Sequence, residues 1–468
     1  MTSEGVKRAA AGLWDDVAGR ERGSVVELVE SIFDRIHTDA SSINALITPM
    51  EDSALADARR IDQMLAQGVR LPLGGMPIVV KDNIDVAGVR CTRGSKWFAD
   101  RIAGTDATVI KGLREAGGIV IGKASLHEFA YGGTNNNPWY GTVRNPWDTE
   151  RIPGGSSGGS GAAVAAGWAA GALGTDTGGS VRCPASFAGL VGLRPTMGAV
   201  SNSGVFHIAP SFDTVGPMAR RARDVATLFG ATVGYDPTDP QSVVFAGATG
   251  CWNSPPIDFS GLRVGVPHEY FLEETEPEIV AAVLALAEVF RELGAEVIDD
   301  CRVPLAAQAR EVASTVIKAE ALSIHVERLE RDRERFGEDV ARRLSLGYEL
   351  SGWRVAQLYH ELLRLQRELQ GVFAGVDVVL TPTAPNSPGK IAESEMIATT
   401  AQVTRFTYPW SVAHVPAISL PCGFTSEGLP IGAQLVGPAH SDLFLLALAE
   451  RYQALTDWHT RVAPHAQP

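Results

Sequence analysis

Cysteine is scarce in this sequence of 468 residues, and its distribution excludes several classes of protein. The cysteines are far apart, odd in number and contain no CxxC pair; they are Cys91, Cys183, Cys251, Cys301 and Cys422. Small secreted domains rely on closely spaced cysteines for disulfides, and structural zinc sites rely on cysteine pairs. We therefore expect neither a disulfide framework nor a structural zinc site.

Long apolar runs and an excess of basic residues are also missing. The N-terminus mixes charges without an apolar stretch of signal-peptide type, and the longest weakly apolar segment, 162–174, is too short to span a bilayer. With 41 basic and 54 acidic residues, the net charge is −13, which argues against a face that binds nucleic acid. The sequence predicts a soluble, cytoplasmic protein without a membrane or nucleic-acid partner.

Helix-like and strand-like segments alternate over most of the chain, which predicts an α/β fold. Apolar positions at helical spacing predict helices over 24–37, 51–67 and 107–116, and apolar runs predict strands over 76–80 and 118–122. The small residues of 162–174 predict a closely packed helix, followed by a strand that ends near Thr175.

The second half continues this alternation with one long interruption. Thr275 and Glu278 form a T-x-x-E box that predicts a helix through Leu293, with strands over 263–267 and 295–299 on either side. Residues 305–373 predict charged amphipathic helices without a strand, a helical excursion placed to cover a substrate pocket. A strand over 376–385 and a last helix capped by Ser441 complete the pattern.

The segment RIPGGSSGGSG, residues 151–161, raises the question of function, because Gly154 to Gly161 are only Gly or Ser. A flexible linker has this composition, but a linker here would divide the α/β core. A Walker phosphate loop needs Lys and then Ser or Thr after its last glycine, where this chain has Ala162 and Ala163. GGSSG also matches the elbow of Ser-His-Asp hydrolases, but RNPWDTERIP precedes it instead of an apolar strand.

A second glycine-rich turn, GALGTDTGGSVRCPAS, places Ser180 24 residues after Ser156. Consecutive glycines let successive backbone N–H groups point into one space, which suits an oxyanion. Lys81 directly follows an apolar strand; it would either pair with Asp82 or reach the surface, or be buried with a lowered pKa and act as a base. Two serines together with this lysine favour nucleophilic catalysis.

These residues resemble the amidase signature family. The likeness rests on IPGGSSGGSGAAVAAG, on ALGTDTGGSVRCPASFAGLVGLRPT and on VVKDNI, which places Lys81 75 residues before Ser156. It extends through VGPMARRARDVA, PWSVAHVPAISLPCG and GLPIGAQLVG, and is weakest over 305–373. The resemblance implies a single domain over 1–468 with a large mixed central sheet covered by helices on both faces. Its parts would be an N-terminal helical segment over about 1–67 and a catalytic core over about 70–240 and 376–460.

The resemblance also implies a mechanism. Ser180 would be the nucleophile, and Ser156, which follows a cis peptide bond in this family, would pass the proton of Ser180 to neutral Lys81. The backbone N–H groups of Thr177, Gly178, Gly179 and Ser180 would hold the oxyanion. Neither a metal nor an organic cofactor is implied, and the partners would be a small-molecule amide and a second copy of the chain in a homodimer.

Other residues match family positions around these groups. Asp176 and Arg182 flank the Ser180 loop and are expected to order it, and Ser157 is expected to orient Ser156. Near the acyl pocket the resemblance places Ala130, Tyr131 and Gly132, with Phe206 and Trp410 as pocket walls or core residues. Aromatic walls would favour an apolar or aromatic acyl group.

Several functions stay open at this point. The first is a free-standing amidase that hydrolyses a small carboxamide or an aryl or alkyl amide. The second is the glutaminase A subunit of a tRNA-dependent amidotransferase; Pro409–Trp410 and Met197–Gly198 replace the more polar segment and the Tyr-Gly usual there. A Ser-His-Asp esterase and a non-catalytic binding protein are further alternatives, the latter disfavoured because Lys81, Ser156 and Ser180 are all present.

Overall fold

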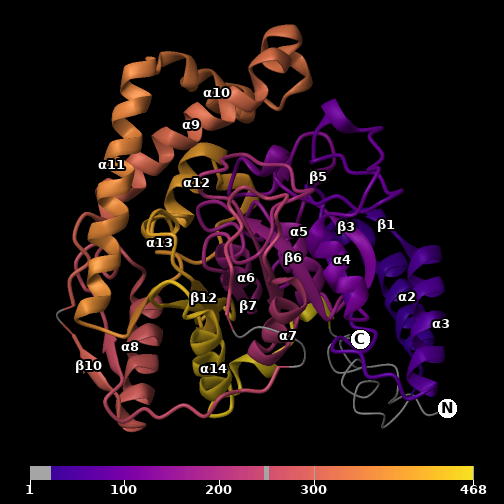
Figure 1. Ribbon diagram of the computed structural model, residues 1–468, viewed down its shortest axis with the longest axis horizontal. Helices are drawn as coiled ribbons and strands as arrows, with labels where there is room; N and C mark the ends of the chain where they lie inside the picture. Colours follow the sequence, from indigo (N-terminus) through magenta and orange to yellow (C-terminus); the bar gives the residue numbers. More distant parts are fainter. Residues whose placement is uncertain (1–22, 247–251, 300, 467–468) are drawn as a thin grey trace.

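One large mixed sheet organises the computed structural model, which describes residues 23–246, 252–299 and 301–466 (Figure 1). Its strands are β1 (Leu46–Pro49), β2 (Pro77–Lys81), β3 (Ile119–Ala124), β6 (Gly171–Asp176), β7 (Val191–Arg194), β8 (Thr214–Ala219), β9 (Arg263–Gly265), β10 (Glu296–Ile298), β11 (Val378–Pro382), β12 (Ala417–Phe424) and β13 (Pro430–Val436). Their spatial order is β1-β3-β2-β6-β8-β7-β12-β13-β11-β9-β10. A separate pair is formed by β4 (Asn136–Asn137) and β5 (Gly141–Thr142).

Strand direction changes along this sheet. The strand β2 is parallel to both β3 and β6, and β9 is parallel to β10 and β11. Between these two parallel parts, β8, β7, β12 and β13 pair antiparallel. The parallel part around β2 matters for function, because parallel neighbours bring their carboxyl ends to the same edge of the sheet.

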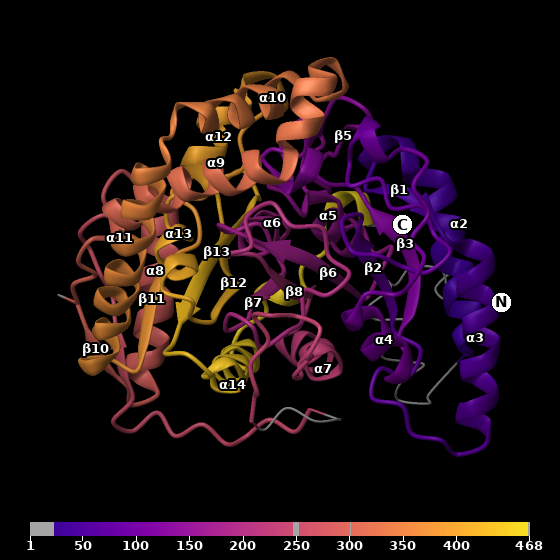
Figure 2. The same cartoon turned by 45° about the horizontal axis from the view of Figure 1, so that its top comes forward.

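Helices cover both faces of the sheet, as the resemblance implied (Figure 2). One face carries α4 (Thr108–Glu115), α7 (Ala222–Thr232), α8 (Pro277–Glu292) and α14 (Asp442–Gln453), and the other carries α5 (Gly158–Ala165) and α6 (Arg182–Ala188). At the β1 edge, α2 (Val25–Ile43) packs on α3 (Glu51–Ala66), which contacts β3. The α/β prediction is confirmed.

The helical excursion also has the predicted form. It consists of α9 (Ala306–Arg331), α10 (Glu338–Ser345) and α11 (Gly352–Gln370), with no strand between them in the part of the chain described there. Together with α13 (Tyr408–Val412), these helices enclose a second apolar core, which also takes in Val379, Ala417 and Val436 of the sheet. The helix α12 (Met396–Val403) contributes Val403 to a third, smaller cluster. Figure 1 shows α9, α10 and α11 standing apart from the sheet on one side.

Three local predictions need correction. The run 162–174 is not one helix, because α5 ends at Ala165, Gly167 takes a left-handed φ of 74°, and β6 already begins at Gly171. Thr275 does not cap α8; its hydroxyl donates to the carbonyl of Phe271, and the helix starts after Glu276 with Pro277 in its first turn. Ser441 occupies the N-cap position of α14 without a side-chain hydrogen bond.

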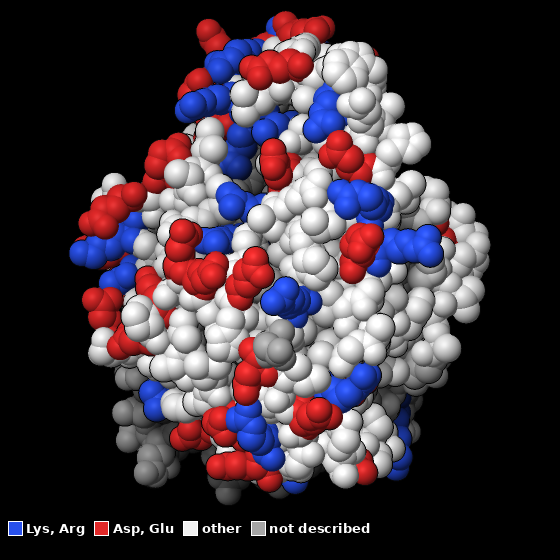
Figure 3. Space-filling model, turned by 90° about the vertical axis from the view of Figure 1, so that its left-hand side faces the viewer, with Lys and Arg blue, Asp and Glu red and all other residues white. Residues whose placement is uncertain are grey.

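The structure also bears on the predictions about membranes, disulfides and basic surfaces. Within the described ranges, no helix is both long and apolar enough to cross a bilayer. The cysteines there, Cys91, Cys183, Cys301 and Cys422, are free, and Cys251 lies outside the described residues. On the face drawn in Figure 3, acidic and basic side chains are interspersed.

The glycine-rich segment is part of the core and not a linker. Every residue from Ile152 to Ala166 is buried, and α5 lies against β2, β3 and β6. At Gly159 a Cβ atom would lie 2.4 Å from the carbonyl oxygen of Ser125 and 2.6 Å from that of Ala45. These are backbone atoms, so they cannot turn away to make room for a side chain. Glycine is therefore required by the close approach of α5 to two other segments.

Gly159→Ala should destabilise the protein by about 3 kcal/mol, because overpacking against backbone is at the costly end of such substitutions. Thermal unfolding of the purified variant measures the effect as a lower Tm. Gly352→Ala is the matched control, since a Cβ there meets no atom within 4 Å and the residue opens α11. Equal Tm values for the two variants would contradict this account of α5.

Candidate active site

The ends of β2 and β6 bring the first two polar groups of the site together. Lys81 is the last residue of β2, and Thr175 is the penultimate residue of the parallel neighbour β6. The Lys81 Nζ donates to the Thr175 hydroxyl at 2.8 Å and to its carbonyl oxygen at 3.3 Å. Asn83 holds the same hydroxyl through its side-chain amide at 3.2 Å. The sheet thus fixes the lysine at its carboxyl edge.

Lys81 is completely buried, which settles the choice left open by the sequence. Its neighbour Asp82 pairs with Lys123 instead, at 2.9 Å, and both of these side chains are buried as well. Burial lowers the pKa of Lys81 to about 7, against the carboxylates of Asp213 and Asp176, which raise it. A neutral amine is therefore accessible near physiological pH.

Ser156 accepts a hydrogen bond from the Lys81 Nζ at 2.8 Å. It precedes α5, and the Gly155–Ser156 peptide bond is cis, as the resemblance implied. Ser157 does not bond to Ser156 in this structure; its hydroxyl donates to the Thr175 carbonyl at 3.2 Å and accepts from the Thr175 N–H at 3.3 Å. Ser157 thus holds the strand end that also positions Lys81.

The loop that presents Ser180 is held by one buried carboxylate. Asp176 accepts hydrogen bonds from the backbone N–H groups of Gly179 at 2.8 Å and Val181 at 3.2 Å. Arg182 binds both of its oxygens at 3.0 Å, and Arg194 approaches at 3.2 Å. Burial opposes ionisation of Asp176, but the two guanidinium groups hold its pKa well below the usual range. This arrangement agrees with the ordering role expected for Asp176 and Arg182.

Not all four predicted oxyanion donors are equally placed. The Gly179 N–H is engaged by Asp176, so it is not available to a bound oxyanion in this arrangement. Thr177, Gly178 and Ser180 line a small cavity. Thr407 further fixes the turn, since its hydroxyl donates to the Gly178 carbonyl at 2.5 Å.

A small cavity lies next to Ser180, and its empty volume of about 370 Å³ includes the solvent at its open mouth. The predicted pocket residues Ala130, Tyr131 and Gly132 line it. Its remaining walls come from the helical excursion and the segments beside it, and they are formed by Ile208, Ile317, Arg343, Thr400, Thr404 and Tyr408. The excursion therefore contributes to the wall of this cavity, as its position in the sequence predicted.

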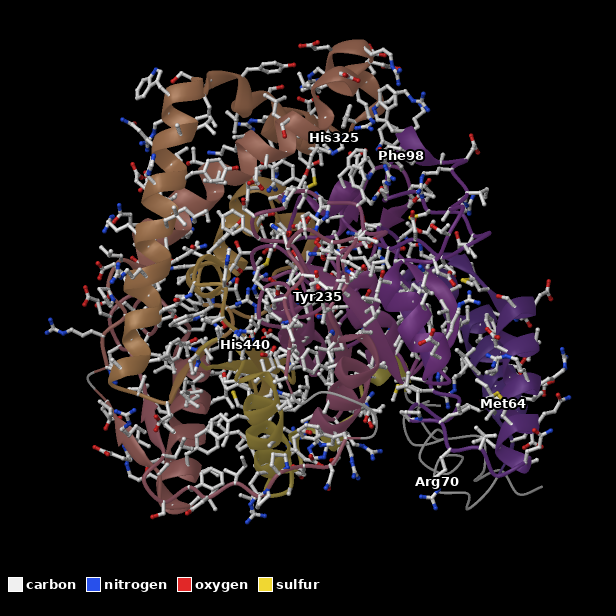
Figure 4. All side chains as sticks on the ribbon, viewed as in Figure 1. Met64, Arg70, Phe98, Tyr235, His325 and His440 are labelled. Carbon is white, nitrogen blue, oxygen red and sulfur yellow. The ribbon has the colours of Figure 1, made fainter. Side chains whose placement is uncertain are left out.

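Phe206 and Trp410 lie elsewhere. Trp410 is fully buried and stacks on Phe271, with ring centroids 5.9 Å apart, in the core beneath the excursion. Phe206 packs in an aromatic cluster with Phe98 and with His325 of α9, both of which are labelled in Figure 4. Neither residue is among those that line the cavity. Of the two readings given by the sequence, the structure favours core residues.

Three polar residues of the site were not singled out from the sequence. Thr175 stood inside a quoted motif, but nothing in the motif distinguishes a hydroxyl that binds Lys81 from one that only packs. Arg194 reaches Asp176 only through the order of the strands in the sheet. It lies on β7, which is separated from β6 by β8, although β8 comes after β7 in the sequence. Arg343 belongs to the excursion, where the resemblance is weakest. No group of three or more metal-ligating side chains occurs in the described ranges.

Comparison with known proteins now completes the assignment. The model of the family described as Amidase matches residues 27–446. The chain belongs to the amidase signature family. It is an enzyme of the kind that acts on amide C–N bonds, and its mixed sheet with covering helices is the architecture of that family.

Individual relatives and structures show how far the likeness reaches. The chain is 39% identical to the A subunit of glutamyl-tRNA(Gln) amidotransferase from Roseiflexus castenholzii, over 96% of both chains. A solved structure described as "An unexpected vestigial protein complex reveals the evolutionary origins of an s-triazine catabolic enzyme" has a TM-score of 0.88 at 30% identity, covering 96% of this chain and 98% of that one. A crystal structure of an amidase has a TM-score of 0.84 at 32% identity, covering 95% and 99%.

Proposed function

We propose that this amidase signature enzyme hydrolyses a small carboxamide through an acyl-enzyme on Ser180. The observation that carries the proposal is the contact of Lys81 with Ser156 at 2.8 Å, because it joins a buried lysine of near-neutral pKa to a serine. The backbone of that serine segment in turn contacts the Ser180 loop, since the Ser157 N–H donates to the Ser180 carbonyl at 3.3 Å. Ser180 itself lines the cavity.

In the proposed reaction, the Ser180 hydroxyl attacks the amide carbon while its proton passes to Ser156, and the proton of Ser156 passes to neutral Lys81. The oxyanion is stabilised by the backbone N–H groups of Thr177, Gly178 and Ser180, each such donor typically contributing about 3–4 kcal/mol. Lys81 then returns a proton through Ser156 to the leaving nitrogen, since an amide nitrogen leaves only when protonated. Water, activated by the same path, releases the carboxylic acid from Ser180.

Ser180→Ala and Lys81→Met should each lower kcat for amide hydrolysis by at least about a thousandfold, because the members of a catalytic unit act together. Ammonia release from a panel of primary amides measures this. Ser160→Ala is the control: that hydroxyl donates to the Leu173 carbonyl within the same glycine-rich segment, and its loss should change kcat less than about threefold. Full activity of Ser180→Ala would disprove the proposed nucleophile.

The pH dependence of kcat/KM should report the ionisation of Lys81. Because the base must be neutral and its pKa is about 7, activity should fall about tenfold per pH unit below pH 6 and level off above about pH 8. Steady-state rates between pH 5 and 9 measure this fall in activity, the acidic limb of the pH profile.

A nearby histidine provides the control for this assignment. The His207 ring contacts the carboxylate of Asp213, and this carboxylate also accepts a hydrogen bond from the Thr177 hydroxyl. His207 is therefore a second titratable group beside the site. His207→Gln should keep the acidic limb if Lys81 causes it. Loss of the limb in that variant, or a flat profile in the parent enzyme, would contradict the role of Lys81.

A second candidate is the A subunit of a glutamyl-tRNA(Gln) amidotransferase. Eight curated relatives at 37–40% identity carry this name, and they support it better than the free-standing amidase that the sequence alone favoured. Both candidates share the proposed chemistry on Ser180 and differ in the amide and in the need for a partner.

The two candidates are separated by the requirements of glutamine hydrolysis. A free-standing amidase should release ammonia from its amide as the purified chain alone. An amidotransferase chain should hydrolyse glutamine at least about tenfold faster with its partner proteins and glutamyl-tRNA than without them. Copurification of the chain from its native host, followed by ammonia measurement with and without tRNA, distinguishes the outcomes.

A further inference from the structure

A buried cation forms part of the wall of the Ser180 cavity. Arg343 of α10 is only 8% exposed. One of its terminal nitrogens, Nη2, donates to the Met396 carbonyl at 2.8 Å and to the Thr400 hydroxyl at 3.0 Å, and its guanidinium carbon lies 5.6 Å from the centre of the Tyr131 ring. Its Nε is buried without a hydrogen-bond partner.

No carboxylate in the described part of the chain forms an ion pair with Arg343. The nearest in sequence, Asp339 one turn earlier, is bonded to the His127 Nε2 at 2.8 Å; the charge of Arg343 helps to lower the pKa of Asp339, but the two side chains form no ion pair. A buried charge without a close counter-charge is costly, and a guanidinium with free donors presents a planar fork that matches a carboxylate. The wall therefore has an anion-binding group that the protein itself leaves unpaired.

The other groups of the wall are neutral. Among the lining residues, Arg343 is the only charged one and none is Asp or Glu. Burial raises the pKa of both Tyr131 and Tyr408, so neither hydroxyl ionises at neutral pH. An ammonium group on a substrate would lose its hydration here, lie near Arg343 and find no carboxylate to bind.

The position of Arg343 is fixed by contacts between the excursion and the segment that carries the pocket residues. His127 binds Asp339, and the Glu128 carboxylate accepts from the Gly337 N–H at 2.7 Å. These two contacts hold the first turn of α10 next to Ala130, Tyr131 and Gly132. Arg343, one turn further on, thus faces the cavity from a rigid support.

From these observations we infer the substrate class of the site. It takes amides whose acyl group carries a carboxylate, bound by Arg343, and no ammonium group. The inference rests on the proposed function of Ser180 and replaces the apolar or aromatic acyl group that the sequence suggested.

Three amides of the same chain length test it. Glutaramate carries the carboxylate, pentanamide lacks it, and L-glutamine adds an ammonium group to glutaramate. The wild-type enzyme should show kcat/KM for glutaramate at least about 50-fold above pentanamide and at least about tenfold above L-glutamine, since a charge-assisted pair discriminates by such factors. Equal values for glutaramate and pentanamide, or a preference for glutamine, would overturn the inference.

Substitution of the arginine tests its role directly. Arg343→Gln should reduce the glutaramate-to-pentanamide ratio to about threefold or less, and Arg343→Lys, which keeps the charge but not the fork, should give an intermediate ratio. Arg342→Gln is the matched control, because Arg342 is the exposed neighbour on α10 and its loss should leave the ratio unchanged. A ratio that survives Arg343→Gln would disprove the assignment.

Binding to the Ser180→Ala protein separates this inference from the proposed chemistry. Calorimetric titration should show tighter binding of glutaramate than of pentanamide or L-glutamine, and the difference should vanish in the double variant with Arg343→Gln. If the wild-type enzyme hydrolysed none of the amides, the proposed function would fail while binding still reported on Arg343. If hydrolysis occurred but binding showed no preference for glutaramate, only this inference would fail.

Discussion

The arrangement of the site depends on one buried carboxylate, that of Asp176. It ends β6 and binds the backbone of the Ser180 loop, and it forms ion pairs with both Arg182 and Arg194 in an interior where unpaired charges are costly. Arg182 extends this network to the Thr407 carbonyl and the Ser411 hydroxyl, so the loop, β7 and α13 are held relative to one another. A serine can be presented in one conformation because these parts cannot move independently.

The proposed reaction also requires a lysine that is neutral near pH 7, and the burial of Lys81 provides it. Lys81 has no carboxylate in direct contact, since Asp82 is used by Lys123, and its hydrogen bonds are to hydroxyl and carbonyl groups. Those partners stabilise the side chain without stabilising its charge as a carboxylate would. The same fold therefore pairs one buried lysine with an acid and leaves Lys81 without one, and burial lowers the pKa of Lys81 to about 7.

Local periodicity predicted the α/β fold and the excursion. The two glycine-rich turns drew attention to Ser156 and Ser180, and the resemblance to the family implied their roles and that of Lys81. It did not predict that the small residues of 162–174 divide between α5 and β6, since alanine and glycine suit either element when packing is close. Phe206 and Trp410 were equally ambiguous, because an aromatic side chain looks the same in sequence whether it lines a cavity or fills a core. Arg343 was out of reach, since its place depends on contacts from His127 and Glu128 across more than 200 positions of the chain.

The reactive groups and the opposite wall of the cavity come from different parts of the chain, and this has a consequence for how enzymes of this fold diversify. The reactive groups come from strand ends and from the segments just before α5 and α6, and Gly159 of α5 is constrained by the backbone of Ser125 and Ala45. Arg343 comes from the excursion, whose apolar core also takes in Phe129, Phe212 and Trp410 from other parts of the chain, and polar contacts from His127 and Glu128 hold α10 beside the pocket segment. We therefore expect substitutions at Ile317 of α9 and at Arg343 of α10, which both line the cavity, to change which acyl group is accepted while the reactive groups stay in place. For protein engineering, we expect a graft of the excursion from one relative onto the sheet of another to exchange specificity only if the apolar residues that this core takes from the rest of the chain are exchanged with it.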